Sequence, residues 1–517
     1  MAATTETVHE SIININKHLN FLSNTLYFVQ SERVKIAPDN IEEDVTGDQI
    51  PLDMLYDGLG IERWIIVSGE RTDIKDNDNR TLPGIRATEL KKIIDVEHIP
   101  YKDSPGDNPH SVITLDKPLI HSYKRSTVII YGNVVQASHG ETLPTEVLGS
   151  GNAAVPIPRF QLKRPPLTYK SASTTSGVQG TESVRVNNVR YYRIDSLLDA
   201  KEGERVYELF DDQNGGATLS FASRLPTGQD NIRAAYRVGI GMEGNVKAEQ
   251  INLLVSRPLG VQGVINPLKA SGGADRDGLD RIRRNAPLAT LALSPLSRLV
   301  SVSDYRAFAL QFAGIGHADA IKLSDSATEY IHVTVAGQDD IPLAEDGELL
   351  INLRNAYRKF GDPSLPVAIS VRELIALVIE AKVSICPDRD WTVVEPLIRK
   401  RLLDAFSFEN SALGKPVYQS QVVTVIQNVP GVDWVDVDVF GGVSESALLN
   451  DEVKKLQSPL PVCVPCATAT SSRLDQARAK EWNKIYHETP RFLPAQLAYL
   501  VPQVARTLAL NLIQRRG

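Results

Sequence analysis

The chain has 517 residues, of which 42% are hydrophobic and 23% are charged, and its net charge is −7 at pH 7. These proportions are typical of a soluble globular protein with about three or four domains, each large enough to bury its own core. The acidic balance argues against general binding to nucleic acids, because such binding requires a concentrated positive surface.

No stretch of the sequence approaches the roughly 20 apolar residues of a membrane span. The first residues, MAATTETVHE, lack the basic and apolar regions of a signal peptide. The cysteines, Cys386, Cys463 and Cys466, are too sparse for a disulfide framework and fit a reducing compartment. We therefore expect a chain that is cytoplasmic when made and does not insert directly into a membrane.

Residues 1–34 carry a helical pattern. Aliphatic residues recur there in alternating steps of four and three, at Val8, Ile12, Ile15, Leu19, Leu22, Leu26 and Val29. This spacing places them on one seam of a helix at the repeat of a coiled coil. Ile13, Phe21 and Phe28 widen the apolar stripe, which suits a bundle of three or more helices. Two interpretations stay open: a helix that packs on its own domain, and a partner-binding helix in an inter-subunit bundle.

The next two regions differ in composition. Residues 35–63 are acidic and rich in turn formers, which predicts a linker. Residues 64–264 contain short β-branched or alternating runs such as WIIVSGE, STVIIYGNVV and ERVYELF, and these predict a β-rich domain of sandwich or barrel type. Within it, His139 and Glu141 have no third group in view that would orient an acid–base pair, so we interpret His139 as a polar turn residue.

Gly239, Gly241 and Gly244 spell G-x-G-x-x-G after a strand-like run, as a dinucleotide-binding turn does. That fingerprint also needs a βαβ unit and an acidic residue about 20 positions later. Here Pro258 and Pro267, with glycines between them, break the chain first. We therefore predict tight structural turns with positive φ or close backbone approach.

Residues 265–320 predict a small helical module. Asp275, Asp277 and Asp280 do not meet the spacing of a calcium loop, because the glycine falls too early and no distal glutamate follows. We instead expect Asp275 to cap a short helix that Pro287 closes.

The charges of this short helix fit its dipole, since Asp277 and Asp280 precede Arg281, Arg283 and Arg284. A second helix is expected to begin with a capping-box-like pair, Ser301 and Asp304, and to end near Gly314.

Residues 321–445 predict strands and helices in the order β-α-β-β-α-β, which is the ferredoxin-like arrangement. The last of these strands, over 432–440, alternates, so Asp436 and Asp438 are expected on a solvated face rather than with Asp433 in a metal cluster.

Residues 446–517 predict a C-terminal extended segment and tail. Cys463 and Cys466 form one C-x-x-C without the second ligand pair of a zinc site, and they are interpreted as loop cysteines.

Several separated blocks of the sequence resemble the baseplate J-like proteins, which are wedge components of contractile phage tails and related injection particles. The blocks are NVVQASHGETLPTEVLGSG, FQLKRPPLTY, SRLPTGQDNIRAAYRVGIGMEGN, INPLKASGGADRDGLDRIRRNAP, PLSRLVSVSDYRAFALQFAGIGHADA and FLPAQLAYLVPQVARTLALNLIQRRG. Two departures stand out. Only Phe221 remains of the F-G-D-G turn that usually precedes R-L-P-x-G, and the N-terminal region is much shorter than in large members of the family.

Taken together, the sequence patterns predict an α+β multidomain chain with an N-terminal bundle helix, a β-rich body, a small helical module and a ferredoxin-like α/β domain, without a cofactor or metal. With the resemblance, they lead us to expect a structural protein rather than an enzyme. In the family, two wedge subunits join a third wedge protein through a helical bundle, and neighbouring wedges close into a ring.

The implied partners are other wedge subunits, including a second J-like chain or copy, with hub or spike, sheath and tube proteins, and no nucleic acid. The chain would then become part of an assembled tail or injection particle and help couple triggering to sheath contraction. A nucleotide-dependent enzyme and a stand-alone surface-binding module remain as alternatives.

Overall fold

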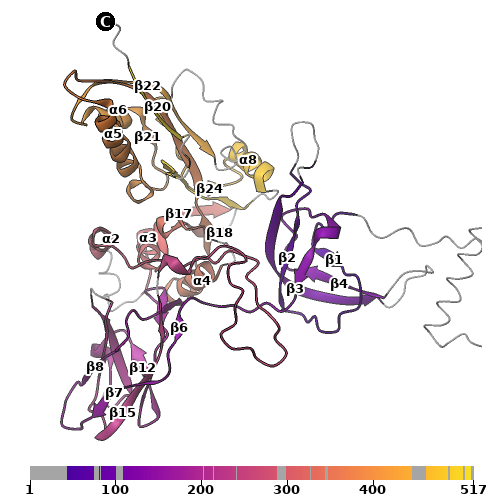
Figure 1. Ribbon diagram of the computed structural model, residues 1–517, viewed down its shortest axis with the longest axis vertical. Helices are drawn as coiled ribbons and strands as arrows, with labels where there is room; N and C mark the ends of the chain where they lie inside the picture. The colour runs from indigo at the N-terminus through magenta and orange to yellow at the C-terminus, as the bar shows by residue number, and fades with distance from the viewer. Residues whose placement is uncertain are drawn as a thin grey trace, which may run out of the picture. The chain divides into compact units, whose positions relative to one another are not determined.

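The computed structural model describes residues 43–513, apart from 75–80, 82, 100–108, 202, 213–214, 240, 288–297, 326–327, 344–346, 445–460, 487–489, 503 and 505–506. The heptad residues between Val8 and Val29 lie outside the described residues, so the bundle helix stays a prediction. The chain is a mixed α+β structure in which strands predominate (Figure 1), as the expected fold class requires. Within the described part, no helix is both long enough and apolar enough to cross a membrane.

The chain divides into two compact units. The first comprises Met1–Ala137 with Lys247–Lys269, and the second comprises Ser138–Val246 with Ala270–Gly517. Strands occupy much of the region predicted to be β-rich, and they are shared between both units.

The first unit is built on a five-stranded antiparallel sheet in the order β1-β4-β3-β2-β5. Its elements are β1 Gln49–Pro51, β2 Trp64–Glu70, β3 Arg86–Ile99, β4 His110–Leu115, η1 Arg125–Thr127 and β5 Ile129–Tyr131. Ile65, Val67 and Ile113 are fully buried in its core, as are Val45 and Ile50. The described part of residues 35–63 is therefore not a separate linker, because its apolar side chains complete this core and its strand β1 pairs with β4.

A buried ion pair lies within this sheet. The Glu89 carboxylate on β3 accepts hydrogen bonds from the backbone N–H groups of Ile120 (2.9 Å) and His121 (3.0 Å) and from the Tyr123 hydroxyl (2.8 Å), and it lies 3.1 Å from the Lys91 amine. Burial alone would raise the pKa of Glu89, but these hydrogen bonds outweigh it and hold the pKa below its ordinary value.

The first part of the second unit contains a seven-stranded sheet in the order β7-β15-β11-β12-β13-β14-β8. The strands are β7 Glu146–Gly151, β8 Arg159–Gln161, β11 Ser183–Val186, β12 Val189–Ile194, β13 Val206–Asp211, β14 Ala217–Phe221 and β15 Gly228–Ala235. All neighbours are antiparallel except β12 and β13. The Phe221 ring is at the centre of the core and contacts Phe160, Tyr191 and Tyr207.

Short elements surround this sheet. They are β6 Glu141–Thr142 paired with β16 Arg237–Val238, β9 Tyr169–Ser171 paired with β10 Val178–Gly180, and the 3₁₀ turns η2 Leu197–Asp199 and η3 Met242–Gly244.

The middle of the second unit packs helices against a three-stranded sheet in the order β17-β18-β19. Its elements are α2 Leu279–Asn285, α3 Val302–Gln311, β17 Ile315–Asp325, β18 Thr328–Gly337, η5 Gln338–Asp340, α4 Glu348–Phe360 and β19 Val367–Val371. Buried aromatic side chains of α3 and α4 fill the core, with Phe308 and Tyr357 in ring contact above Val333 and Val335 of β18.

The C-terminal part is organised by one long strand, β20 Glu373–Ile385. It pairs with β22 Val432–Ser444 on one side and with β26 Gln496–Tyr499 and β27 Leu508–Leu512 on the other. The remaining elements are α5 Trp391–Ala405, η6 Phe408–Asn410, β21 Val417–Tyr418, α6 Gln419–Gln427, β23 Cys463–Val464, β24 Thr470–Ser471, α8 Gln476–Tyr486 and β25 Phe492–Leu493.

This topology corrects the ferredoxin-like prediction. The predicted strands exist, but they divide between two sheets: β18 pairs with β19 in one, whereas β20 pairs with β22 in the other. The reason is that the tail strands β26 and β27 occupy the edge of β20 that a ferredoxin-like sheet would give to an earlier strand. Residues 315–320, assigned to the helical module, belong to β17 instead.

Candidate assembly surface

Helix α3 begins with the capping box that the sequence predicts. The Ser301 hydroxyl accepts a hydrogen bond from the Asp304 backbone N–H (3.2 Å), and the Asp304 carboxylate accepts one from the Ser301 N–H (2.8 Å). Burial alone would raise the pKa of Asp304, but its hydrogen bonds to Ser301 and Val300 hold it below the ordinary value. The cap fixes the start of α3, and the helix ends at Gln311, three residues before Gly314.

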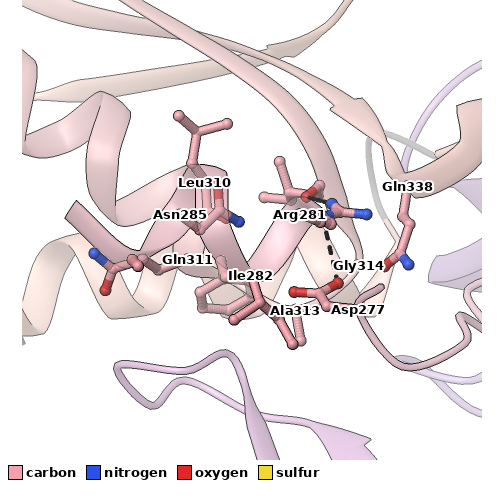
Figure 2. A pocket seen from close by; sticks show the side chains of 12 residues that line it. Asp277, Arg281, Ile282, Asn285, Leu310, Gln311, Ala313, Gly314 and Gln338 are labelled. Carbon is pink, nitrogen blue, oxygen red and sulfur yellow. Dashed lines mark hydrogen bonds and ion pairs between the residues drawn. The ribbon is translucent and has the colours of Figure 1, made fainter. Parts of the chain in front are cut away.

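A cavity of about 410 Å³ opens between α2, the end of α3 and the residues that follow α3 (Figure 2). Its apolar lining comes from side chains such as Ile282, Leu310 and Phe312, and its polar lining includes Asp277 and Arg281. The described residues of the lining include no histidine, cysteine, serine or threonine. The described lining therefore combines apolar side chains with one charged pair.

Arg281 links two segments that line the cavity. Its Nε lies 3.3 Å from the Asp277 carboxylate, and its guanidinium also donates a hydrogen bond to the Ile315 carbonyl, so it ties α2 to the segment after α3. The helix charges follow the prediction, with Asp280 in the first turn of α2 and Arg283 and Arg284 in the last.

The predicted helix cap at Asp275 is wrong. Helix α2 starts only at Leu279, and the residue at its N-cap position is Gly278, which has no side chain to cap it. The Asp275 carboxylate instead accepts a hydrogen bond from the Met242 backbone N–H (2.9 Å) in the glycine turn. A capping prediction from spacing alone missed this long-range partner.

The glycine turn, Gly239–Gly244, is tightly packed. Gly239 and Gly241 have positive φ values of 126° and 105°. A Cβ on Gly241 would lie 2.1 Å from the Asp275 carboxylate, and a Cβ on Gly244 would lie 2.8 Å from His139. The turn leads into the 3₁₀ turn η3, and the next described helix is α2, so the strand–turn–helix order of a dinucleotide site is not formed here.

The other residues singled out in the sequence lie in separate places. His139 is exposed beside the glycine turn. Asp438 accepts a hydrogen bond from Lys382 on β20 (2.8 Å), whereas Asp433 and Asp436 are exposed. Over the described ranges, no group of three or more His, Cys, Asp or Glu side chains is placed to hold a metal ion.

The cysteines are all free thiols. Cys463 lies in β23 and is half-buried, whereas Cys466 is buried, and burial raises the pKa of the Cys466 thiol to about 11. A thiol with such a pKa is protonated at neutral pH and is a poor nucleophile.

A surface that the sequence analysis missed is the apolar loop, residues 247–269. Leu253, Val255 and Leu259 are exposed to 84%, 108% and 106%. The Asn266 side chain joins the two ends of the loop. Its oxygen accepts a hydrogen bond from the Ile251 backbone N–H (2.8 Å), and its amide group donates hydrogen bonds to the backbone carbonyls of Lys247 (2.9 Å) and Leu268 (3.0 Å). The apolar run INLLV, residues 251–255, is the feature of the sequence that could have indicated this surface. Three strongly exposed aliphatic side chains within seven residues of one loop make this loop a candidate for a surface that another protein covers.

One protein-family model matches part of this sequence. Residues 297–370 match the baseplate J-like central domain. A chain of the anti-feeding prophage baseplate is 10% identical over 77% of this chain and 72% of that chain, with a TM-score of 0.24. A chain of the type VI secretion system TssK-TssF-TssG baseplate subcomplex is 11% identical over 52% of this chain and 55% of that chain, with a TM-score of 0.18. No curated protein matches the sequence.

The matched range begins just before α3 and covers β17, β18 and α4 and most of β19. Of the sequence blocks that resemble the family, PLSRLVSVSDYRAFALQFAGIGHADA lies within the matched range except for its first two residues, and the other blocks lie outside it.

Proposed function

The chain carries a baseplate J-like central domain, and we propose that it is a structural wedge component of a contractile phage-tail-like injection particle. The family match over residues 297–370 carries this proposal. In the proposed role, the chain joins other wedge subunits, including a second J-like chain or copy, and the resulting ring contacts hub or spike, sheath and tube proteins. The ring then helps to transmit triggering to sheath contraction.

The described surface supports an assembly role. The apolar loop presents Leu253, Val255 and Leu259 to solvent, and burying such side chains against a partner releases free energy that the isolated chain does not gain. The cavity beside α2 and the glycine turn give no support to the nucleotide-dependent enzyme. No observation favours a stand-alone surface-binding module.

We assign the contact with the other wedge subunits to the predicted helix between Val8 and Val29. Its seam of aliphatic residues matches the repeat of helices that associate side by side. Two charges on the seam would have to be buried in a bundle, whereas two charges on the polar face would stay in water.

The experiment compares two double variants in the producing cell. Leu19→Asp with Leu22→Asp places both charges on the seam, and Asn20→Asp with Asn24→Asp adds the same charge on the polar face. The seam variant is expected to abolish particle formation while the purified chain keeps the melting temperature of the native protein. The control is expected to form particles normally. Unchanged particle yield from the seam variant would rule out the bundle.

A further inference from the structure

The outer face of the seven-stranded sheet carries three arginines in one cross-strand row. Arg185 on β11 stands directly opposite Arg190 on β12 and, on its other side, opposite Arg233 on β15. Val184 and Val186 flank Arg185 and are buried, so strand alternation sends the arginines to the solvent face. All three are exposed. We call Arg185, Arg190 and Arg233 the arginine row.

The charges of the arginine row are not neutralised by the described residues. None of the three side chains forms an ion pair with a described carboxylate. Arg185 approaches the Asn188 carbonyl (3.5 Å), Arg233 approaches the Asp230 carbonyl (3.4 Å), and the Arg190 guanidinium lies 5.4 Å from the centre of the Tyr192 ring. These contacts orient the side chains but leave three positive charges side by side.

Such a row disfavours folding of the isolated chain. Directly opposite residues of antiparallel strands have Cβ atoms about 4.5–5.5 Å apart, and like charges on such a pair of residues are destabilising. Arg185 experiences this repulsion from both sides. A covering surface that carries carboxylates would remove the repulsion.

We propose that the arginine row is a docking site for an acidic segment of a neighbouring protein subunit. Guanidinium groups bind carboxylates through paired hydrogen bonds, which gives both charge and geometric selectivity. The spacing of the row, about 5 Å between strands, is close to the spacing of side chains three or four residues apart on a helix. The fitting partner is therefore a helix with Asp or Glu on successive turns, lying across β12, β11 and β15.

The adjoining surface allows close approach. On one side of the row, the next positions on the same face are Tyr192, which is 59% exposed, and the small residues Ser183 and Ala235. A helix over the arginine row would therefore meet one aromatic ring and two short side chains. Nucleic acid fits this surface less well, because the chain has a net charge of −7 and binders of nucleic acid commonly contact about 6–10 phosphates.

A first test measures whether the arginine row destabilises the isolated chain, and it uses the purified full chain. Arg185→Gln removes the central charge, and we expect the melting temperature to rise by about 1–4 °C at low salt, with a smaller rise at high salt. Arg257→Gln, at an exposed position in the apolar loop, is the matched control and is expected to leave the melting temperature unchanged. A fall for Arg185→Gln would mean that the row stabilises the chain alone and would overturn the proposal.

A second test identifies the partner and rests on the proposed function only in taking the partner to be a subunit of the same assembly. Tyr192→p-benzoylphenylalanine is installed in the full chain in the producing cell, irradiated, and the cross-linked peptide is sequenced. The expected peptide comes from a protein and carries at least two carboxylates three or four residues apart. Arg185→Gln with Arg190→Gln and Arg233→Gln should reduce its yield at least tenfold.

The outcomes separate the two proposals. Particles that contain the chain but give no cross-link from Tyr192, a peptide without carboxylates, or cross-linked nucleic acid would overturn the docking site and leave the baseplate role intact. An acidic cross-linked peptide from a cell that forms no particle would support the docking site and contradict the baseplate role. The melting temperature of the triple variant, expected at or above that of the native chain, excludes unfolding as the cause of a lost cross-link.

Discussion

Replacing Leu253 and Leu259 with serine tests whether the apolar loop is an assembly surface. Both leucines are almost fully exposed, so the isolated chain gains little from their burial and its free energy of unfolding should change by less than about 0.5 kcal/mol. If a partner buries both, each contributes about 1.5–3 kcal/mol to association. Together they contribute about 3–6 kcal/mol, which corresponds to a loss of about 10²–10⁴-fold in affinity for the double variant.

The assay compares the melting temperature of each purified chain with the fraction of that chain recovered in sedimenting particles. Leu198→Ser with Val135→Ser is the matched control, because these residues are comparably exposed but lie outside the loop. We expect unchanged melting temperatures for both double variants and a loss of particles only for the loop variant. Equal particle yields, or a marked fall in the melting temperature of the loop variant, would refute the reasoning.

Three further predictions concern Glu89, Gly241 and nucleotide binding. Glu89→Gln removes the charge paired with Lys91, and it should lower the stability by about 3 kcal/mol at pH 7, since a buried charge loses its partner. Folding lowers the pKa of Glu89. The ionised Glu89 side chain therefore contributes its full stabilisation above the unfolded-state pKa near 4.5, and this stabilisation is lost as the pH falls through the lower pKa of the folded chain. The melting temperatures of the variant and native chains should therefore converge in acid. Glu97→Gln, exposed on the same strand, is the control, and an equal loss there would contradict the account. Gly241→Ala places a Cβ against Asp275 at positive φ and should destabilise the chain by about 1–3 kcal/mol, whereas NAD or ATP should not shift the melting temperature of the native chain; a clear shift would revive the enzyme.

Features that depend on neighbouring residues were predictable from the sequence. The capping box of Ser301 and Asp304 lies within one turn of helix, and the strand runs that include Trp64–Glu70 and Val206–Asp211 alternate or are β-branched over their own length. The glycine turn was also recognised as structural, because the sequence shows that no βαβ unit follows it.

Features that depend on distant pairing were not predictable. Strand β20 receives its second edge from tail residues Gln496–Tyr499 and Leu508–Leu512, more than a hundred positions away, and no local pattern indicates which sheet a strand joins. Asp275 was assigned to the helix that follows it because its partner, Met242, lies in an earlier turn. The arginine row likewise exists only through the register of β11 with β12 and β15.

The measurement that tests the central claim most directly is affinity purification of the tagged full chain from its native producer, with mass spectrometry of the bound proteins and electron microscopy of the eluate. A baseplate component should be recovered in particles together with sheath, tube and other wedge proteins, with density for this chain in the ring around the hub. Recovery of the chain as a lone monomer, above all one that carries a bound nucleotide, would contradict the assignment.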